Sequence, residues 1–94
     1  MIRSYRDRDT EAIAERLRVS RFPPDIQRRA QMKLMILNNA SGLDDLRTPP
    51  GNRLEALSGN RSGQYSIRIN DQWRVCFVWS EGEAHQVEIT DYHR

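Results

Sequence analysis

The residues of this chain that could do the most chemistry lie in two places, a pair of arginines in its second half and the last four positions. The final run, Asp91-Tyr92-His93-Arg94, combines a carboxylate, a phenol, an imidazole and a guanidinium. A histidine with its ordinary pKa of about 6.5 can accept or donate a proton at neutral pH. Guanidinium groups such as those of Arg68 and Arg74 can bind phosphate through paired N–H donors. These residue types suit cleavage of RNA by its own 2′-hydroxyl, which needs a base, an acid and donors to the phosphate.

The stretch Tyr65–Trp79 alternates apolar and polar side chains, as strands do when they bury one face. Turn-forming residues at 70–72 interrupt it, so the stretch predicts a β-hairpin. Keeping both apolar sets on one face requires a loop centred on Asp71, which puts Arg68 opposite Arg74. Like charges opposed across a sheet are destabilising, so the pair favours an anion site. Two solvated arginines on an open face are the alternative.

The segment Ala84–His93 alternates again, and its polar residues have the same parity as those of the hairpin. If the segment pairs with the hairpin, Tyr92 lies on the face of the two arginines and His93 lies at its rim. A disordered polar tail is the alternative, because chain ends are commonly frayed.

Helical spacing of apolar residues predicts two helices before the hairpin. The first covers Glu11–Arg18 after N-cap candidates such as Asp7, with Ile13 and Leu17 on its apolar side. The second begins at Pro24 and buries Ile26, Ala30, Leu34 and Leu37. The remaining predicted elements are a brief strand at Met1–Tyr5, a helical turn around Leu43 and Leu46, and a strand at Arg53–Leu57.

This order of elements predicts a single α+β domain over residues 1–94. Two N-terminal helices would pack on a twisted, mainly antiparallel, four- to five-stranded sheet. The face with Arg68 and Arg74 would then form the floor of an open groove.

Composition excludes several classes of protein. The chain has 94 residues, one cysteine and a formal net charge of +2, with fourteen arginines against one lysine. A single cysteine rules out an internal disulfide, and His85 and His93 lack metal-ligand spacing, so we expect no metal and no cofactor. No apolar run approaches the roughly 18 residues of a membrane span, so we expect a cytoplasmic protein with no membrane contact. The arginine bias suits phosphate binding, although a GC-rich genome produces the same bias.

Four segments of the sequence together resemble one known family. They are Pro23–Ala30, Pro49–Leu57, Gly63–Phe77 and the terminal Asp91-Tyr92-His93. The spacing from the hairpin loop to the terminal run is specific, and the resemblance covers essentially the whole chain. The sequence is similar to the HigB toxins, the plasmid maintenance system killer branch of the RelE/ParE superfamily.

The resemblance implies a compact toxin that enters the ribosomal 30S A site and cuts translated mRNA. The reaction would be a metal-independent attack of the 2′-hydroxyl on the 3′-phosphate. The resemblance also implies neutralisation by a HigA-type helix-turn-helix antitoxin, with operator DNA bound only by the toxin–antitoxin complex.

The resemblance also implies roles for particular residues. Those that match the family's catalytic positions are Arg74, Asp91, Tyr92 and His93. Arg68 matches a basic position on the equivalent strand of RelE-like toxins, and we assign Arg53 and Arg61 with it to RNA and phosphate binding.

Two further positions of the RNA-binding groove depart from the family. Glu55 stands where some HigB toxins have a histidine, and Ser58 stands where a lysine commonly follows. A carboxylate could still act as a base, so Glu55, Asp91 and His93 are all candidates for the acid and the base. Loss of one cation weakens phosphate binding, so we expect a mild toxin or one with altered codon preference.

Two other functions fit the same residues. A ParE-like toxin would use this scaffold to inhibit DNA gyrase and would have no ribonuclease site. A non-catalytic module would use Arg68 and Arg74 only to dock a nucleic acid or an acidic protein, and His93→Ala would then leave its function intact. The terminal Asp-Tyr-His together with Arg74 favours the endoribonuclease.

Restoring the missing cation tests the departure at position 58. We expect Ser58→Lys to raise the rate of mRNA cleavage about threefold or more, because it adds a positive charge beside the phosphate site. The measurement is the initial rate of reporter mRNA cleavage with translating ribosomes. An unchanged rate would show that the absent lysine does not limit cleavage.

Overall fold

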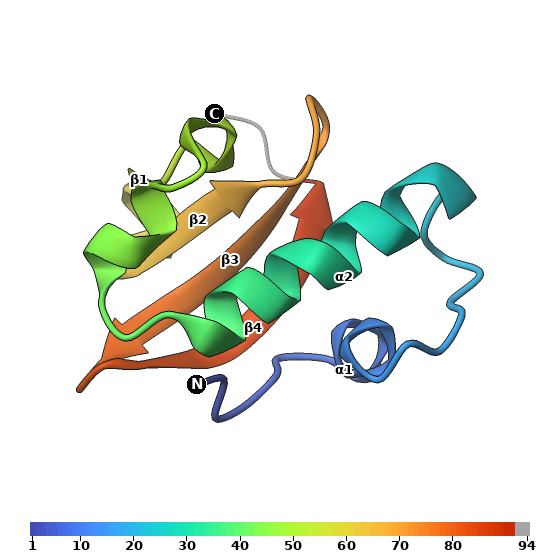
Figure 1. Cartoon of the computed structure of the whole chain (residues 1–94), viewed down its shortest axis with the longest axis horizontal. Helices are drawn as coiled ribbons and strands as arrows, with labels where there is room; N and C mark the ends of the chain where they lie inside the picture. Colours follow the sequence, from blue (N-terminus) through green and yellow to red (C-terminus); the bar gives the residue numbers. More distant parts are fainter. Residues whose placement is uncertain (92–94) are drawn as a thin grey trace.

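The computed structural model describes residues 1–91 and shows two helices on one face of a four-stranded antiparallel sheet (Figure 1). The strands lie in the order β1 (Glu55–Ala56), β2 (Gln64–Arg68), β3 (Trp73–Ser80) and β4 (Glu83–Asp91). The helices are α1 (Arg8–Ala14) and α2 (Pro24–Asn39). Short 3₁₀ helices in the connections are η1 (Leu43–Arg47), η2 (Pro50–Asn52) and η3 (Gly59–Arg61). The predicted α+β class is confirmed.

The β2–β3 hairpin has the predicted register. Arg68 pairs with Arg74, so even-numbered residues face even-numbered ones. The side-chain oxygen of Asn70 closes the loop by accepting the backbone N–H of Trp73 at 2.7 Å. The loop is therefore centred on Asp71, and one face of the hairpin is uniformly apolar.

Strands β3 and β4 meet through a two-residue turn followed by a β-bulge. Glu81 and Gly82 have φ angles of 53° and 77°, which suit the tight hairpin turns that match strand twist. The turn pairs Ser80 with Glu83, an even-numbered residue with an odd-numbered one. An extra residue at Gln86, where φ is 52°, then shifts the register by one position.

One face of the sheet carries Arg68 and Arg74, and we call it the arginine face. Beyond this bulge the polar residues of β4 lie on the arginine face. Thr90 pairs with Arg74 and Glu88 pairs with Cys76. The predicted common parity is thus confirmed for Glu88 and Thr90, whereas Gln86 lies in the bulge itself.

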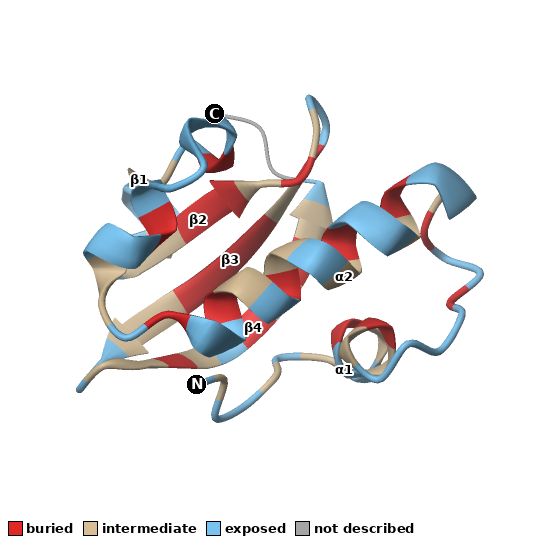
Figure 2. Cartoon of the chain, in the orientation of Figure 1, coloured by how far each residue is buried: buried red, intermediate tan, exposed pale blue. Residues whose placement is uncertain are grey.

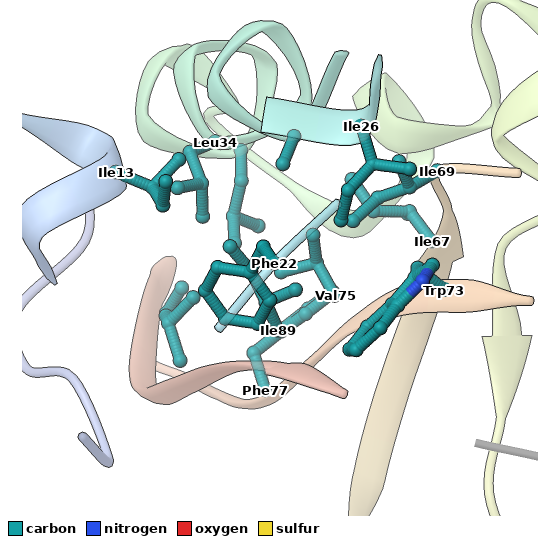
Figure 3. Packing of buried hydrophobic residues seen from close by; sticks show 14 of the residues in the cluster. Ile13, Phe22, Ile26, Leu34, Ile67, Ile69, Trp73, Val75, Phe77 and Ile89 are labelled. Atoms are coloured by element: carbon teal, nitrogen blue, oxygen red, sulfur yellow. The ribbon is translucent and has the colours of Figure 1, made fainter. Parts of the chain in front are cut away.

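The opposite face of the sheet packs on α2 and forms the core (Figure 3). The α2 residues that helical spacing predicts to be buried, Ile26, Ala30, Leu34 and Leu37, are all buried. They meet odd-numbered side chains of the hairpin, including Ile67, Ile69, Val75 and Phe77. Phe22 packs edge-on against Trp73, with ring centroids 5.4 Å apart. Buried and exposed positions therefore follow one another along α2 (Figure 2).

Helix α1 lies earlier in the chain than predicted, because it begins at Arg8 rather than at Glu11 and ends at Ala14 rather than at Arg18. The N–H of Arg16 donates to the carbonyl of Ile13 at 3.0 Å, and the N–H of Leu17 donates to the carbonyl of Ala12 at 2.9 Å. These two bonds form a Schellman motif, which requires the left-handed conformation that Arg16 adopts with φ of 66°. Leu17 is 57% exposed and does not extend the apolar side of the helix.

Two predicted strands are also shorter than expected. The segment Met1–Tyr5 makes only isolated parallel bridges to β4, because the bulge in β4 lies between the bridged positions. The strand predicted over Arg53–Leu57 is limited to the two residues of β1. Arg53 cannot extend it, since its φ of 45° is left-handed.

One buried hydroxyl group joins α1 to the sheet. Thr10 is 0% exposed, and its Oγ1 accepts the backbone N–H of Ile89 at 3.0 Å. The same hydroxyl donates to the carboxylate of Asp7 at 3.0 Å. Asp7 in turn caps α1 by accepting the N–H of Thr10 at 2.7 Å, which confirms the predicted N-cap. The part of β4 next to the arginine face therefore depends on this cap.

Replacing the buried hydroxyl tests its structural role. We expect Thr10→Val to lower the free energy of unfolding by about 1–3 kcal/mol, because it leaves the N–H of Ile89 buried without an acceptor. Urea denaturation measures the loss. Thr10→Ser keeps the hydroxyl and removes only a methyl group, so it should cost about 1 kcal/mol or less. A larger loss for Thr10→Ser than for Thr10→Val would contradict this role.

Candidate functional site

Arg74 lies on the face of the sheet away from the helices, and its guanidinium group is held at three points. Its Nε donates to Ser66 Oγ at 2.7 Å, and its Nη2 donates to the carbonyl oxygen of Arg53 at 2.6 Å. Its Nη1 lies 3.4 Å from Oε1 of Glu55 in an ion pair. The side chain is only 12% exposed. These contacts fix the plane of the guanidinium before any ligand arrives.

The carbonyl group of Arg53 is positioned by its neighbour Asn52. Asn52 is 0% exposed, and its Nδ2 donates to two carbonyl oxygens of the η1–η2 segment at 3.2 Å each. Lys33 of α2 donates to its Oδ1 at 2.5 Å. Burial, Arg29 and Arg68 lower the pKa of Lys33.

Each of the two opposed hairpin arginines has a carboxylate of its own. Arg68 forms an ion pair with Asp71 in the loop, and Arg74 forms one with Glu55. Opposed like charges destabilise a sheet, and these two carboxylates offset that repulsion. The predicted register is thus compatible with a stable hairpin.

A further cation and carboxylate meet over the same face. Nη1 of Arg61 donates to Oε1 of Glu88 and to Oε1 of Gln64, each at 3.0 Å. Cys76, which pairs with Glu88 in the sheet, is 1% exposed. Burial raises the pKa of the Cys76 thiol to about 11, with Arg61 lowering it and Glu88 raising it to lesser degrees. Cys76 is therefore a neutral thiol at neutral pH and a poor nucleophile.

Asp91 does not share the arginine face by strand alternation. It pairs with Trp73, at the parity of the core side, and its Oδ2 accepts Nε2–H of Gln72 at 3.0 Å. The other two members of the predicted catalytic run, Tyr92 and His93, lie outside the described residues. Their places on the arginine face and at its rim stay predictions.

The side chains of Arg53 and Ser58 are exposed on either side of β1. Arg53 contributes to the arginine face through its carbonyl oxygen, which accepts a hydrogen bond from Arg74. Sequence reasoning missed Ser66 and Glu88, which position Arg74 and Arg61. The signal for both was their even parity, since polar residues at those positions must face the arginines.

This face offers oriented guanidinium groups for a phosphate or a carboxylate. Among residues 1–91, no three His, Cys, Asp or Glu side chains come together to hold a metal ion. Within the same residues, no helix is long and apolar enough to cross a membrane. The two hollows that we describe lie against the helices, and Arg74 lines neither of them.

Comparison with known proteins decides the family. A model of the HigB-like toxins, described as the RelE-like toxin of the type II toxin–antitoxin system HigB, matches residues 3–93. The chain belongs to this HigB-like toxin family. The match includes every residue that we assign to the arginine face.

Two named relatives of this family support the assignment. Toxin HigB-1 of Vibrio cholerae serotype O1 is 48% identical over 63 residues, which are 67% of this chain and 66% of that protein. Endoribonuclease HigB of Proteus vulgaris is 27% identical over 93 residues, which are 99% of this chain and 100% of that protein. The chain thus spans just under two thirds of the first relative and all of the second.

Two solved structures share the fold of this chain. A point mutant of YafQ from E. coli superposes with a TM-score of 0.64 at 11% identity, covering 97% of this chain and 93% of that one. The YoeB–YefM complex from Staphylococcus aureus gives a TM-score of 0.61 at 14% identity, covering 100% and 99%. At such low identities these likenesses show the fold alone.

The buried thiol of Cys76 gives a test of the packing over the arginine face. We expect iodoacetamide at pH 8 to modify Cys76 in the folded protein at least about 100-fold more slowly than in urea, because a pKa of about 11 leaves little thiolate. Mass spectrometry over time measures the two rates. Equal rates would mean that the face opens to solvent and that Cys76 is not held beneath Arg61 and Glu88.

Proposed function

We propose that this chain is a ribosome-dependent mRNA endoribonuclease, the toxin of a type II toxin–antitoxin pair. The observation that carries the proposal is the guanidinium of Arg74, held by Ser66, Glu55 and a backbone carbonyl on a sheet face that α1 and α2 leave uncovered. A guanidinium fixed in this way can stabilise charge that develops on a phosphate without first reorganising. The family match and the relative named Endoribonuclease HigB support the assignment.

The proposed reaction needs no metal. The 2′-hydroxyl loses its proton to a base and attacks the adjacent phosphorus, and the bond to the 5′-oxygen breaks as an acid protonates that oxygen. The products are a 2′,3′-cyclic phosphate and a 5′-hydroxyl. Arg74 stabilises the phosphate oxygens, while Arg68, Arg61 and the exposed Arg53 bind neighbouring phosphates.

Glu55 has two possible roles in this scheme. Its carboxylate pairs with Arg74, so an incoming phosphate would replace it as the counter-anion of the guanidinium. Once displaced, Glu55 would lie beside the phosphate and could accept the 2′-hydroxyl proton. Asp91 and His93 are the other candidates for acid and base, and Tyr92 could donate a proton or stack on a base.

The gyrase inhibitor and the non-catalytic module use the same fold and are less well supported. The matching family is HigB-like, and a full-length relative bears the name of an endoribonuclease. A docking module would also not need the terminal Asp-Tyr-His run. Both alternatives predict no cut in mRNA.

The proposed partners follow from the family. The family description places its members in type II toxin–antitoxin systems, and one structural neighbour is named as the complex of YoeB with YefM. We propose that a HigA-type helix-turn-helix antitoxin neutralises this chain and that the complex alone binds operator DNA. The targets are mRNA and the ribosomal 30S A site, which places the action in the cytoplasm.

A cleavage assay tests the proposal. Purified protein is added to a reporter mRNA with and without translating ribosomes, and the 3′ ends are mapped. We expect cuts only with ribosomes, and Arg74→Gln should lower the rate by about 10²–10³, because it removes the fixed charge at the phosphate. His93→Ala should lower it by about 10²–10⁴ if His93 transfers a proton.

Arg47→Gln is the matched control, since it removes the same charge from an arginine that is 69% exposed on η1. It should cleave at the rate of the unmodified protein. Absence of cleavage under all conditions, with growth still arrested by expression, would favour gyrase inhibition or docking. Full cleavage by Arg74→Gln would remove Arg74 from the reaction.

A further inference from the structure

The helical side of the molecule has a hollow that the proposed function does not use. It has a volume of about 340 Å³ and lies between α1 and α2. Ile13 and Leu17 line it together with Arg16, Arg18 and Arg28, and among the described residues no acidic side chain lines it. We call this hollow the α1–α2 groove. Its size is at the lower end of the range for ligand sites.

The arginines of the α1–α2 groove carry charge that the fold does not compensate. Within residues 1–91, none of Arg16, Arg18 and Arg28 has a carboxylate within 4.0 Å. In the same α1–α2 connection, by contrast, Arg21 pairs with Asp9 at 2.7 Å. All three groove arginines are exposed, so their charges are available to an external partner.

Arg16 occupies a position where an arginine is unfavourable for the backbone. Its φ of 66° closes α1 in a left-handed conformation that glycine adopts with less strain. The arginine at this point places a guanidinium group on the groove. The closing motif of α1 requires the left-handed backbone but not an arginine side chain, so the choice of arginine here points to a role of the side chain itself.

The groove also offers apolar surface and an unmatched donor. Leu17 is 57% exposed at its edge. Gln31 lines both the groove and a second hollow of about 140 Å³, in which Met35 is half exposed. The Nε2 of Gln31 is buried with no acceptor among the described residues.

The wall of the groove is already fixed by hydrogen bonds. Nε2 of Gln27 donates to the carbonyls of Val19 and Phe22 at 2.8 and 3.0 Å, and its Oε1 accepts the N–H of Val19 at 3.1 Å. These bonds tie the α1–α2 connection to α2. A partner would therefore meet a site that needs little ordering.

We propose that the α1–α2 groove binds an acidic segment of a partner protein that carries aliphatic side chains between its carboxylates. Carboxylates would pair with Arg16, Arg18 and Arg28, and an aliphatic side chain would cover Leu17. RNA fits the groove less well, because none of the described residues that line it is an aromatic residue that could stack on a base. The groove lies on the helical side of the sheet, so this binding leaves the arginine face open.

Fluorescence anisotropy with a defined peptide tests the proposal. The probe is a fluorescein-labelled peptide with repeated Glu-Leu-Glu-Glu-Leu-Glu, and the control peptide has serine in place of leucine. We expect the leucine peptide to bind the folded protein, and the serine peptide to bind it at least about tenfold more weakly. The double variant Arg16→Gly, Arg28→Gln should weaken binding of the leucine peptide about tenfold or more, whereas Arg47→Gln should not change it.

Thermal unfolding separates loss of the site from loss of the fold. Arg16→Gly relieves the left-handed strain, so the Tm of the double variant should not fall. The proposal would be overturned if the folded protein bound the leucine and serine peptides equally well. It would also be overturned if Arg47→Gln and the double variant bound the leucine peptide equally well. A double variant that lost RNA binding, in a protein that bound neither peptide, would overturn it as well. Self-association that only the double variant abolishes would assign the groove to a second copy of the chain instead. The readout is binding alone, so it stands apart from whether the protein cleaves mRNA.

Discussion

The pairing of even-numbered residues with even-numbered ones across β2, β3 and the end of β4 is the constraint on which the rest of the structure depends. It puts Ile67, Ile69, Val75 and Phe77 of the hairpin in the core that packs on α2, and both arginines of the hairpin on the other face. The tight turn at Glu81-Gly82 imposes the opposite pairing at the far end of β4. The bulge at Gln86 reconciles the two, because a single inserted residue restores the parity. Without it, Val87 and Ile89 would turn away from the core and Glu88 away from Arg61.

A second constraint follows from the first, since gathering cations on one face requires anions to hold them. Arg74 is mostly buried, and a buried charge is costly unless it is paired and hydrogen-bonded. Glu55 supplies the charge, while Ser66 and the carbonyl of Arg53 supply the hydrogen bonds. The same carboxylate competes with any phosphate for the guanidinium. A neutral side chain at position 55 would leave Arg74 more attractive to RNA but less stable in the free protein, so this position sets a balance between folding and binding.

The sequence predicted those features that depend on local periodicity. Alternation over Tyr65–Trp79 fixed the hairpin register, and the spacing in α2 identified its buried residues. The end of α1 was predicted wrongly because an arginine, not a glycine, takes the left-handed position of its closing motif. The bulge had no local signal, since it follows from combining a two-residue turn with a buried face. The pairings of the site arginines were not predicted, because Ser66, Glu55 and Glu88 reach them from three different strands, although Glu55 was already assigned to the groove.

The arginines on the two sides of the sheet differ in whether a carboxylate of the chain pairs with them, and this difference bears on their functions. On the arginine face, Arg61, Arg68 and Arg74 are each paired with a carboxylate of the same chain, which fixes their geometry and limits their attraction for distant anions. Such an arrangement suits a site that must place a phosphate accurately and need not capture it from solution. Under the proposed function, a ribosome that already holds the mRNA would supply the substrate at high local concentration. The arginines of the α1–α2 groove have the reverse properties, exposed and without a carboxylate among residues 1–91, which suits capture of a free partner.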